Sequence, residues 1–147
     1  MSAVATATAI VLGTFSTAAS ANLVITEYIE GSANNKAIEI SNLGSSDINL
    51  DANAYKLILF ANGADASKPG NTETLTGTLA PGKSIVFHNA GATIDAFKLG
   101  SASTVTYFNG DDAVVLTKND VVIDRFGKRG EDPGTEWKDP NNADFSS

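Results

Sequence analysis

The sequence contains no cysteine and only one histidine in 147 residues. The lack of cysteine excludes disulfide bridges, thiol catalysis and zinc sites built from cysteine and histidine. His88 is the only possible base for a serine–histidine–acid triad, and no G-x-S-x-G motif is present to supply the nucleophile. We therefore expect no catalytic residue in this chain, and we interpret His88 as a surface or rim residue near the end of a strand.

Basic residues are also scarce. Ten Lys or Arg stand against 17 Asp or Glu, which gives a net charge of −7. This field repels phosphate backbones and anionic membranes, so we expect no tight nucleic-acid binding by this domain alone. The one basic cluster, Arg125, Lys128 and Arg129, lies among three acidic residues. It is typical of a solvated loop, with a local nucleic-acid contact as the alternative.

Charge is absent from the first 26 residues. An apolar run from Ala9 to Phe15 is followed by small residues that end in Ala19-Ser20-Ala21. This order is typical of a secretory signal peptide with an A-x-A cleavage site, although no Lys or Arg precedes the run, and a disordered leader is the alternative. The run is too short to span a membrane, which takes about 20 apolar residues. We predict a signal peptide over residues 1–21, a secreted protein and no membrane span.

A sustained helical stripe is missing as well. From residue 22 onward, short apolar runs rich in β-branched and aromatic residues alternate with Gly, Asn, Asp and Pro. Asn119 and Asp120 tolerate a left-handed backbone and predict a hairpin between the last two runs. About eight short strands at this spacing predict an all-β sandwich or barrel. The predicted strands are 23–30, 36–42, 55–62, 72–79, 83–89, 103–108, 112–118 and 121–127.

The composition changes after Gly130, where prolines and acidic residues replace the strand pattern. Apart from Trp137, this segment is typical of a linker. The length of the chain suits one domain. We assign residues 22–137 to that domain and residues 138–147 to a linker towards a downstream domain.

The stretch "GTLAPGKS" matches the phosphate-loop pattern G-x-x-x-x-G-K-[ST] through Gly77, Gly82, Lys83 and Ser84. A phosphate loop must lead into a helix whose N-terminal amides hold the phosphates. Here the residues after Lys83 have strand composition, and Pro81 followed by Gly82 suits a type II turn. We interpret the match as a β-turn and expect no nucleotide and no other cofactor.

Two acidic residues on the first two predicted strands, Glu27 and Glu39, could form a carboxylate pair. Glu27 has the parity of Leu23 and Ile25, so its side chain is expected to point inward. A buried carboxylate there must accept hydrogen bonds, which favours a structural role over a glycosidase-like acid–base pair.

Two further carboxylates, Asp111 and Asp112, follow Gly110 directly before a predicted strand. Aspartate at this position commonly fixes a turn by accepting backbone N–H groups. Calcium is the alternative ligand, but the D-x-D-x-D-G spacing of a calcium loop is absent. We expect no metal site.

An ordered set of motifs resembles the bacterial lamin-tail domain. "LVITEYIEG", "KAIEISN" and "YKLILFANG" are similar to its opening, "LAPGKSIVF" to its L-x-P-G turn, "GDDAVVLTKNDVVIDRFG" to its final hairpin and "GTEW" to its G-x-x-W. Thr26 replaces the usual Asn, and Lys36-Ala37 replaces a frequent Glu-Trp pair. The opening motif falls on Ile25, Glu27, Ile38, Glu39, Ile40 and Asn42, followed by Leu50.

The resemblance implies an immunoglobulin-like β-sandwich without catalytic residues of its own. It is greatest to the module that precedes the catalytic domain of extracellular nucleases, whose metal-binding motifs are absent from this sequence. The implied role is substrate presentation, domain docking or attachment to a cell-surface or extracellular polymer, with the downstream catalytic domain as partner. The alternative is an autonomous adhesion or carbohydrate-binding module, which would be favoured by exposed coplanar aromatic side chains.

Overall fold

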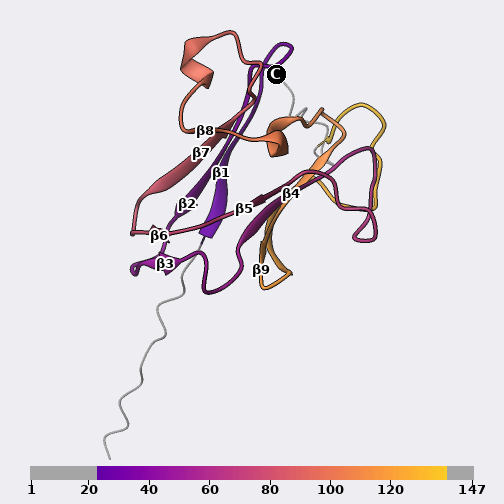
Figure 1. Ribbon diagram of the computed structural model, residues 1–147. Helices are drawn as coiled ribbons and strands as arrows, with labels where there is room; N and C mark the ends of the chain where they lie inside the picture. Colours follow the sequence, from indigo (N-terminus) through magenta and orange to yellow (C-terminus); the bar gives the residue numbers. More distant parts are fainter. Residues whose placement is uncertain (1–22, 139–147) are drawn as a thin grey trace, which may run out of the picture.

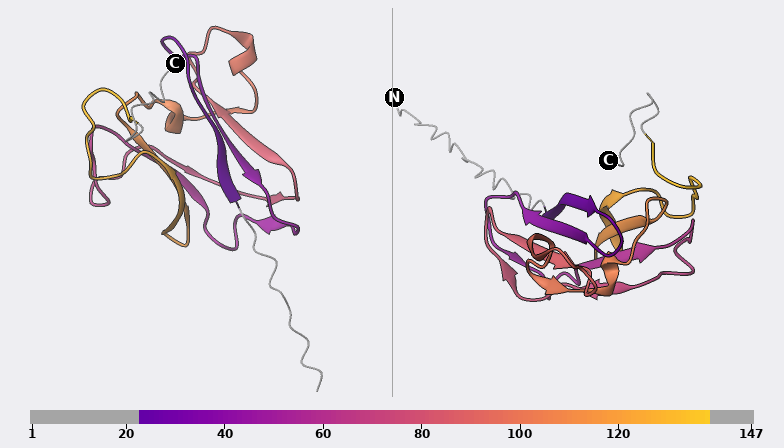
Figure 2. Two further views of the ribbon diagram at one scale, coloured as in Figure 1. Left: turned by 180° about the vertical axis from the view of Figure 1, so that it is seen from behind. Right: turned by 90° about the horizontal axis from the view of Figure 1, so that it is seen from above.

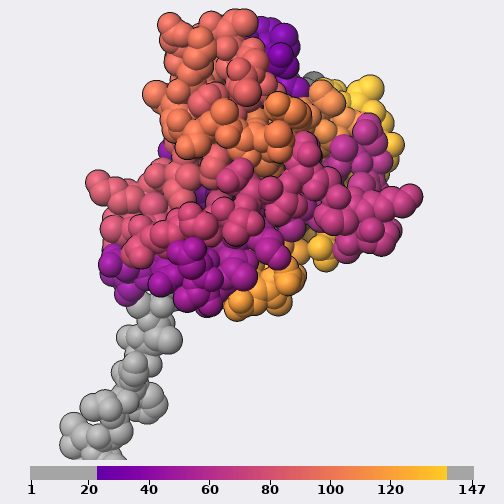
Figure 3. Space-filling view, in the orientation of Figure 1, coloured from indigo at the N-terminus to yellow at the C-terminus, as the bar shows by residue number. Residues whose placement is uncertain are grey.

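A computed structural model describes residues 23–138 of the chain (Figure 1). The predicted signal peptide and most of the predicted linker lie outside these residues. The strands are β1 (Leu23–Glu30), β2 (Lys36–Asn42), β3 (Ile48–Asn49), β4 (Lys56–Phe60), β5 (Thr72–Thr74), β6 (Thr78–Leu79), β7 (Ser84–His88), β8 (Ser101–Ala102), β9 (Ala113–Lys118) and β10 (Val121–Phe126). Two short 3-10 helices, η1 (Asp95–Phe97) and η2 (Thr104–Thr106), complete the described part, and the segment that holds η1 stands at one end of the molecule (Figure 1 and Figure 3).

Two four-stranded sheets pack face to face, as Figure 2 shows from above. One has the order β1-β2-β7-β8 and the other the order β10-β9-β4-β5, while β3 and β6 form a small ladder. All pairs are antiparallel except β7 and β8. This arrangement confirms the predicted all-β, immunoglobulin-like sandwich.

The main core lies between the two sheets. Ile38 and Ile40 of β2 face Leu57 and Leu59 of β4, with Val114 among the residues that β9 contributes. Each of these side chains is buried. Alternate residues of β2 and β4 fill this layer because successive side chains of a strand point to opposite faces.

Aromatic side chains close one side of the sandwich between β1 and β10. The Tyr28 ring stacks on Phe108, with ring centroids 4.2 Å apart, and on Phe126 at 3.8 Å. The Ile25 backbone N–H also donates to Asp124 Oδ2 at 2.8 Å. Burial raises the pKa of the Tyr28 hydroxyl, and the nearby Glu30 carboxylate, which accepts its hydrogen bond, raises it further.

Both predicted turns are present. Asn119 and Asp120 have φ of 49° and 62°, so the left-handed backbone expected of the β9–β10 hairpin is confirmed. Gly82 has φ of 68°, and the Lys83 N–H donates to Ala80 O at 3.1 Å. A positive φ at the third residue and this closing hydrogen bond are the marks of a type II turn.

The predicted strand over 103–108 is wrong. Ser103 instead caps η2, because its Oγ accepts the Val105 N–H at 3.3 Å. Val105 and Phe108 then lie one short helical turn apart, and both are fully buried. The predicted strand over 72–79 is also two strands, since β5 pairs with β4 and β6 pairs with β3. The short strands β3 and β8 were not predicted.

A second, smaller apolar cluster covers the outer face of the β9 sheet. Phe60, Ala113 and Val115 form its centre, and Trp137 packs against it. The Trp137 indole N–H donates to Asp112 O at 2.8 Å, and its backbone N–H donates to Gly110 O at 3.1 Å. The segment after Gly130 therefore reaches back to the sandwich at Trp137, although its composition is typical of a linker.

Within residues 23–138, no helix is long and apolar enough to cross a membrane. The longest helical segments there are the three-residue turns η1 and η2.

Candidate functional site: an asparagine-lined pocket

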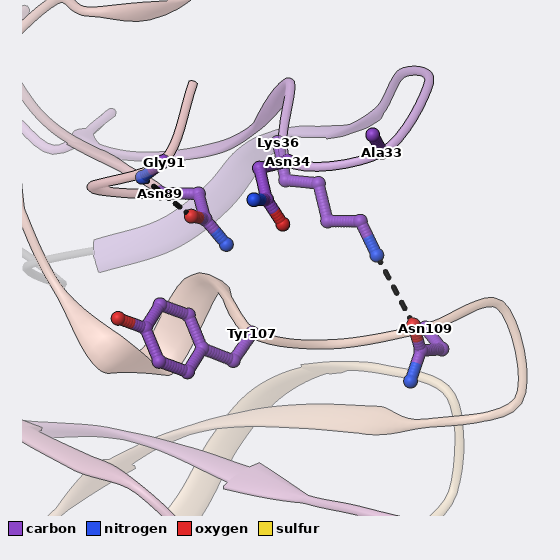
Figure 4. Close-up of a pocket in the computed structure, with 7 residues that line it drawn as sticks. All are labelled: Ala33, Asn34, Lys36, Asn89, Gly91, Tyr107 and Asn109. Atoms are coloured by element: carbon purple, nitrogen blue, oxygen red, sulfur yellow. Dashed lines mark hydrogen bonds between the residues drawn. The ribbon is translucent and has the colours of Figure 1, made fainter. Parts of the chain in front are cut away.

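A pocket of about 490 Å³ opens at the end of the sandwich where β1 and β7 end (Figure 4). Three connections build it: the turn between β1 and β2, the segment after β7, and the loop that leads to β9. Its volume is in the range of roughly 300 to 1,000 Å³ that small-molecule sites occupy. It is lined by Ala33, Asn34, Lys36, Asn89, Gly91, Tyr107 and Asn109.

Lys36 is a buried cation whose hydrogen-bonding capacity is used up. Its ammonium group donates to Phe108 O, to Asn109 Oδ1 at 3.2 Å and to Glu30 Oε1 at 3.2 Å. An ammonium group has three donors, and all three have acceptors here. Because Glu30 also balances its charge, Lys36 offers the pocket neither a free donor nor an uncompensated positive charge.

Two buried asparagines hold the walls in place. The Asn89 amide accepts the Gly91 N–H at 2.9 Å and donates to Thr106 O at 3.3 Å. The Asn35 carbonyl oxygen accepts the N–H groups of residues 93 and 94, each at 3.0 Å, and so ties the β1–β2 turn to the segment after β7. The pocket is therefore shaped by the protein's own hydrogen bonds before any ligand arrives.

Two further asparagines line the pocket, and each has polar side-chain atoms without a hydrogen-bond partner in the described part of the chain. Within residues 23–138 the Asn34 amide makes no hydrogen bond, and Asn109 uses its carbonyl oxygen for Lys36 while its amide nitrogen stays free. The Tyr107 ring, 48% exposed, lies across the pocket from Asn34 and Asn89 (Figure 4). The arrangement can donate and accept hydrogen bonds and can stack on a flat ligand, but it holds no nucleophile and no acid–base pair.

The phosphate-loop residues do not form an anion site. The Gly77 N–H donates to the Asp51 carboxylate at 2.7 Å, and the Gly82 N–H donates to Asn42 O at 2.8 Å. The Lys83 N–H closes the turn. Amides that would have to hold a phosphate are thus already bonded, one of them to a carboxylate that would repel it. Ser84 Oγ lies 2.8 Å from Ser41 Oγ on the neighbouring strand.

The expected inward orientation of Glu27 is wrong. A β-bulge shifts the register of β1 between Ile25 and Glu27, so Tyr28 takes the inward position and Glu27 is exposed. An extra residue in one strand reverses the parity of everything after it. The sequence gives no indication of this bulge.

Glu27 and Glu39 are nevertheless cross-strand neighbours and line a groove of about 270 Å³ with apolar residues such as Val86 and Phe97. Glu39 Oε1 accepts hydrogen bonds from Thr26 Oγ1 at 2.6 Å and Ser41 Oγ at 3.2 Å. A glycosidase acid is a carboxyl withdrawn from water, whereas Glu27 is exposed. The pair therefore lacks the environment of an acid–base site.

Asp112 fixes a turn. It is 1% exposed, and its two carboxylate oxygens accept the backbone N–H groups of Asn62 and Asn109 at 2.9 and 2.8 Å. Burial raises the pKa of this carboxyl, and the two N–H donors act in the opposite direction. In the described part of the chain, no group of three or more His, Asp or Glu could hold a metal ion. The adjacent Asp111 does not join Asp112 in such a group.

The three basic residues are divided between two places. Arg125 and Lys128 line a pocket of about 300 Å³ beside Trp137, and Lys128 pairs with Glu131. Arg129 lies over the Phe60 ring, 6.0 Å from its centroid, and lines a different pocket. The three side chains therefore line two different pockets. His88 lies at the end of β7, where Nδ1 is 2.9 Å from Leu99 O.

The asparagine-lined pocket was not predicted from the sequence. Asn34, Asn89 and Asn109 all stand in Asn- and Gly-rich turns, where asparagine is ordinarily explained by turn geometry. The only indication of the pocket in the sequence is that these three turns lie next to strands. The strand order, which the structure provides, shows that the turns meet.

Comparison with known proteins identifies the family. A family model, the Lamin Tail Domain, matches residues 16–130, which is more than half of the 147 residues. The chain belongs to the lamin tail domain family. A search of curated proteins gives no match. The resemblance found in the motifs is thereby confirmed, and the chain is a non-catalytic immunoglobulin-like module.

Residues of the family motifs have structural tasks in this lamin tail domain. Asn42 is fully buried: its amide nitrogen donates to Ser46 O and Leu79 O, each at 2.8 Å, and its carbonyl oxygen accepts the Gly44 N–H at 2.9 Å. It thereby fixes the connection from β2 to β3. The matched range ends before Trp137, although Trp137 is packed on the same sandwich.

Proposed function

We propose that this lamin tail domain is a non-catalytic module of a secreted multidomain protein and attaches that protein to an extracellular polymer through the asparagine-lined pocket. The observation that carries the proposal is the pocket itself. It presents the side-chain amide of Asn34 and the amide nitrogen of Asn109, which have no partner within residues 23–138, and an exposed Tyr107 side chain, but no carboxylate, histidine or serine.

The proposed parent is an extracellular nuclease, with its catalytic domain as the partner downstream. Support comes from the signal-peptide pattern at residues 1–21 and from the resemblance to modules that precede such catalytic domains. The site geometry favours attachment over presentation of DNA. A net charge of −7 opposes duplex DNA, and Lys128, one of the three basic residues, is paired with Glu131.

The surface does not fit the autonomous carbohydrate-binding alternative in its expected form. Tyr107 is the one aromatic side chain among the exposed large apolar residues of the described part, so no row of coplanar rings is present there. An extended flat platform for a crystalline polymer is therefore not supported.

Attachment can be tested in the cells from which the protein comes, with residues 1–21 in place. The fraction of exported protein bound to cells and matrix is measured for the natural sequence, for Tyr107→Ala and for Asn34→Ala. We expect both variants to move into the medium. Leu43→Ala, which changes a side chain that is 62% exposed in the β2–β3 turn, is the matched control and should stay bound.

An unchanged distribution of both pocket variants would overturn the proposal.

Mass spectrometry of the exported protein tests the leader, for which we expect Asn22 at the N-terminus. Incubation of the isolated chain with duplex DNA and Mg²⁺ tests catalysis, and we expect neither cleavage nor a gel shift at physiological salt. If DNA cleavage copurifies with the chain and is lost when carboxylates of the chain are substituted, the non-catalytic assignment is wrong.

A further inference from the structure

We propose that the ligand of the asparagine-lined pocket is a neutral sugar unit whose ring stacks on Tyr107 and whose hydroxyl groups bond to Asn34 and Asn109. This inference rests on the proposed function and names the ligand class of the same site. It follows from three features of the pocket: its charge balance, its mixture of donors and acceptors, and its single exposed ring.

The charge balance selects a neutral ligand. Lys36 is the one charged side chain that lines the pocket, and its three donors are taken by Phe108 O, Asn109 Oδ1 and Glu30 Oε1. A phosphate or carboxylate ligand would find no free cationic donor. A cationic ligand would find no carboxylate among the side chains that line the pocket.

The free polar groups suit hydroxyls. A hydroxyl both donates and accepts, and a side-chain amide offers donors and an acceptor on one planar group. Asn34 supplies a complete amide, whereas Asn109 supplies its nitrogen because Lys36 holds its oxygen. Lys36 is thus a positioning residue that holds the Asn109 carbonyl oxygen, and the Asn109 amide nitrogen has no hydrogen-bond partner within residues 23–138 (Figure 4).

The ring supplies the apolar half of the recognition. A pyranose carries C–H groups on its faces and hydroxyls around its edge, so it needs a flat apolar surface beside a polar wall. Tyr107 lies across the pocket from the amides, 48% exposed, and gives such a surface at low conformational cost. One ring inside a hollow, rather than several on a flat face, fits the end or a branch of a glycan chain.

The test uses methyl glycosides of glucose, galactose, mannose and N-acetylglucosamine, added to ¹⁵N-labelled protein and followed by two-dimensional NMR. We expect at least one of them, with millimolar affinity, to shift the side-chain amide signals of Asn34 and Asn109. Tyr107→Ala should weaken that binding by about tenfold or more, which corresponds to about 1.4 kcal/mol. Tyr107→Phe, which keeps the ring, should retain affinity within about threefold.

The controls separate the ligand class from the fold and from the attachment role. Leu43→Ala should bind like the natural protein, and thermal melting confirms that each variant is folded. Glucuronic acid and glucose 6-phosphate should bind no more tightly than the neutral glycosides. Tighter binding of either, binding that survives Tyr107→Ala, or no shift of the pocket amides with any of the glycosides would overturn the inference.

The two proposals fail separately. If Tyr107→Ala releases the exported protein but no glycoside binds, the sugar inference is wrong and the attachment role stands. If a glycoside binds in the pocket and the pocket variants remain attached to cells, the ligand class is right and the attachment role is wrong.

Discussion

Gly127 directly follows β10 and lies against the indole ring of Trp137. A Cβ built on Gly127 would lie 2.6 Å from the indole Nε1, 2.8 Å from Cε2 and 3.0 Å from Asp112 O. The residue also has φ of 70°. We predict that Gly127→Ala displaces Trp137, because the indole can leave the sandwich and the backbone at Asp112, directly before β9, cannot.

The free-energy cost of Gly127→Ala has two parts, and Gly82→Ala measures one of them alone. Gly82 has φ of 68° and nothing within 4 Å of its Cβ position, so Gly82→Ala incurs the backbone strain alone, about 1 to 2 kcal/mol. Gly127→Ala adds the lost hydrogen bond from the indole to Asp112 O, about 1 kcal/mol, and part of the burial of a large aromatic ring. We expect a total of about 3 to 5 kcal/mol for Gly127→Ala.

The assay is urea denaturation followed by fluorescence and by far-ultraviolet circular dichroism. Trp137 is the only tryptophan in the sequence, so its emission reports on the docked tail alone. In the natural protein the two transitions should coincide, as for one cooperative unit. Gly127→Ala should shift the native emission to the red, and Gly82→Ala should leave it unchanged. Equal free energies of unfolding for the two variants, with equal emission, would refute the reasoning.

Lys83→Ala should change the free energy of unfolding by no more than about 0.5 kcal/mol, because Lys83 is an exposed turn residue. Mg-ATP should leave the melting temperature of the natural protein unchanged. A rise in melting temperature with nucleotide that Lys83→Ala abolishes would restore the phosphate-loop interpretation. Phe87→Ala should cost about 3 to 5 kcal/mol in calorimetry, since its ring is 6% exposed in the main core. Asp112→Ala should cost about 2 to 4 kcal/mol by leaving two backbone N–H groups without acceptors, while Asp111→Ala should cost far less. Ca²⁺ should raise the melting temperature of neither the natural protein nor these two variants, and a calcium-dependent rise would revive the metal site.

The sandwich could be predicted because most of its strands carry local information. The run from Ala113 to Lys118 is apolar and bounded by turn residues, and Asn119 and Asp120 tolerate the backbone that the hairpin needs. Gly82 likewise specifies its turn without help from the rest of the chain. Such features depend on the backbone conformations that a single residue can adopt, and these can be inferred from the residue type alone.

The errors arise where a distant or single-residue event overrides local pattern. Ser103 to Phe108 has strand composition, yet the Ser103 hydroxyl caps a helical turn, and burial of Val105 and Phe108 follows a spacing of three rather than two. The bulge before Glu27 reverses the direction of its side chain, and β1 contains no glycine that would indicate a bulge. The pocket depends on three turns from different parts of the chain, so no window of sequence contains it.

The order of the strands also sets when the protein can fold. β2 ends at Asn42, and its partner β7 begins at Ser84; β4 ends at Phe60, and its central partner β9 begins at Ala113. Neither sheet can close until long stretches of chain have been brought together, and pairing of this kind makes β-sandwiches slow to fold. A nascent chain therefore stays unfolded until nearly all of the domain has been synthesised. In the export that we propose for this protein, that delay would leave the chain unfolded while it crosses the membrane.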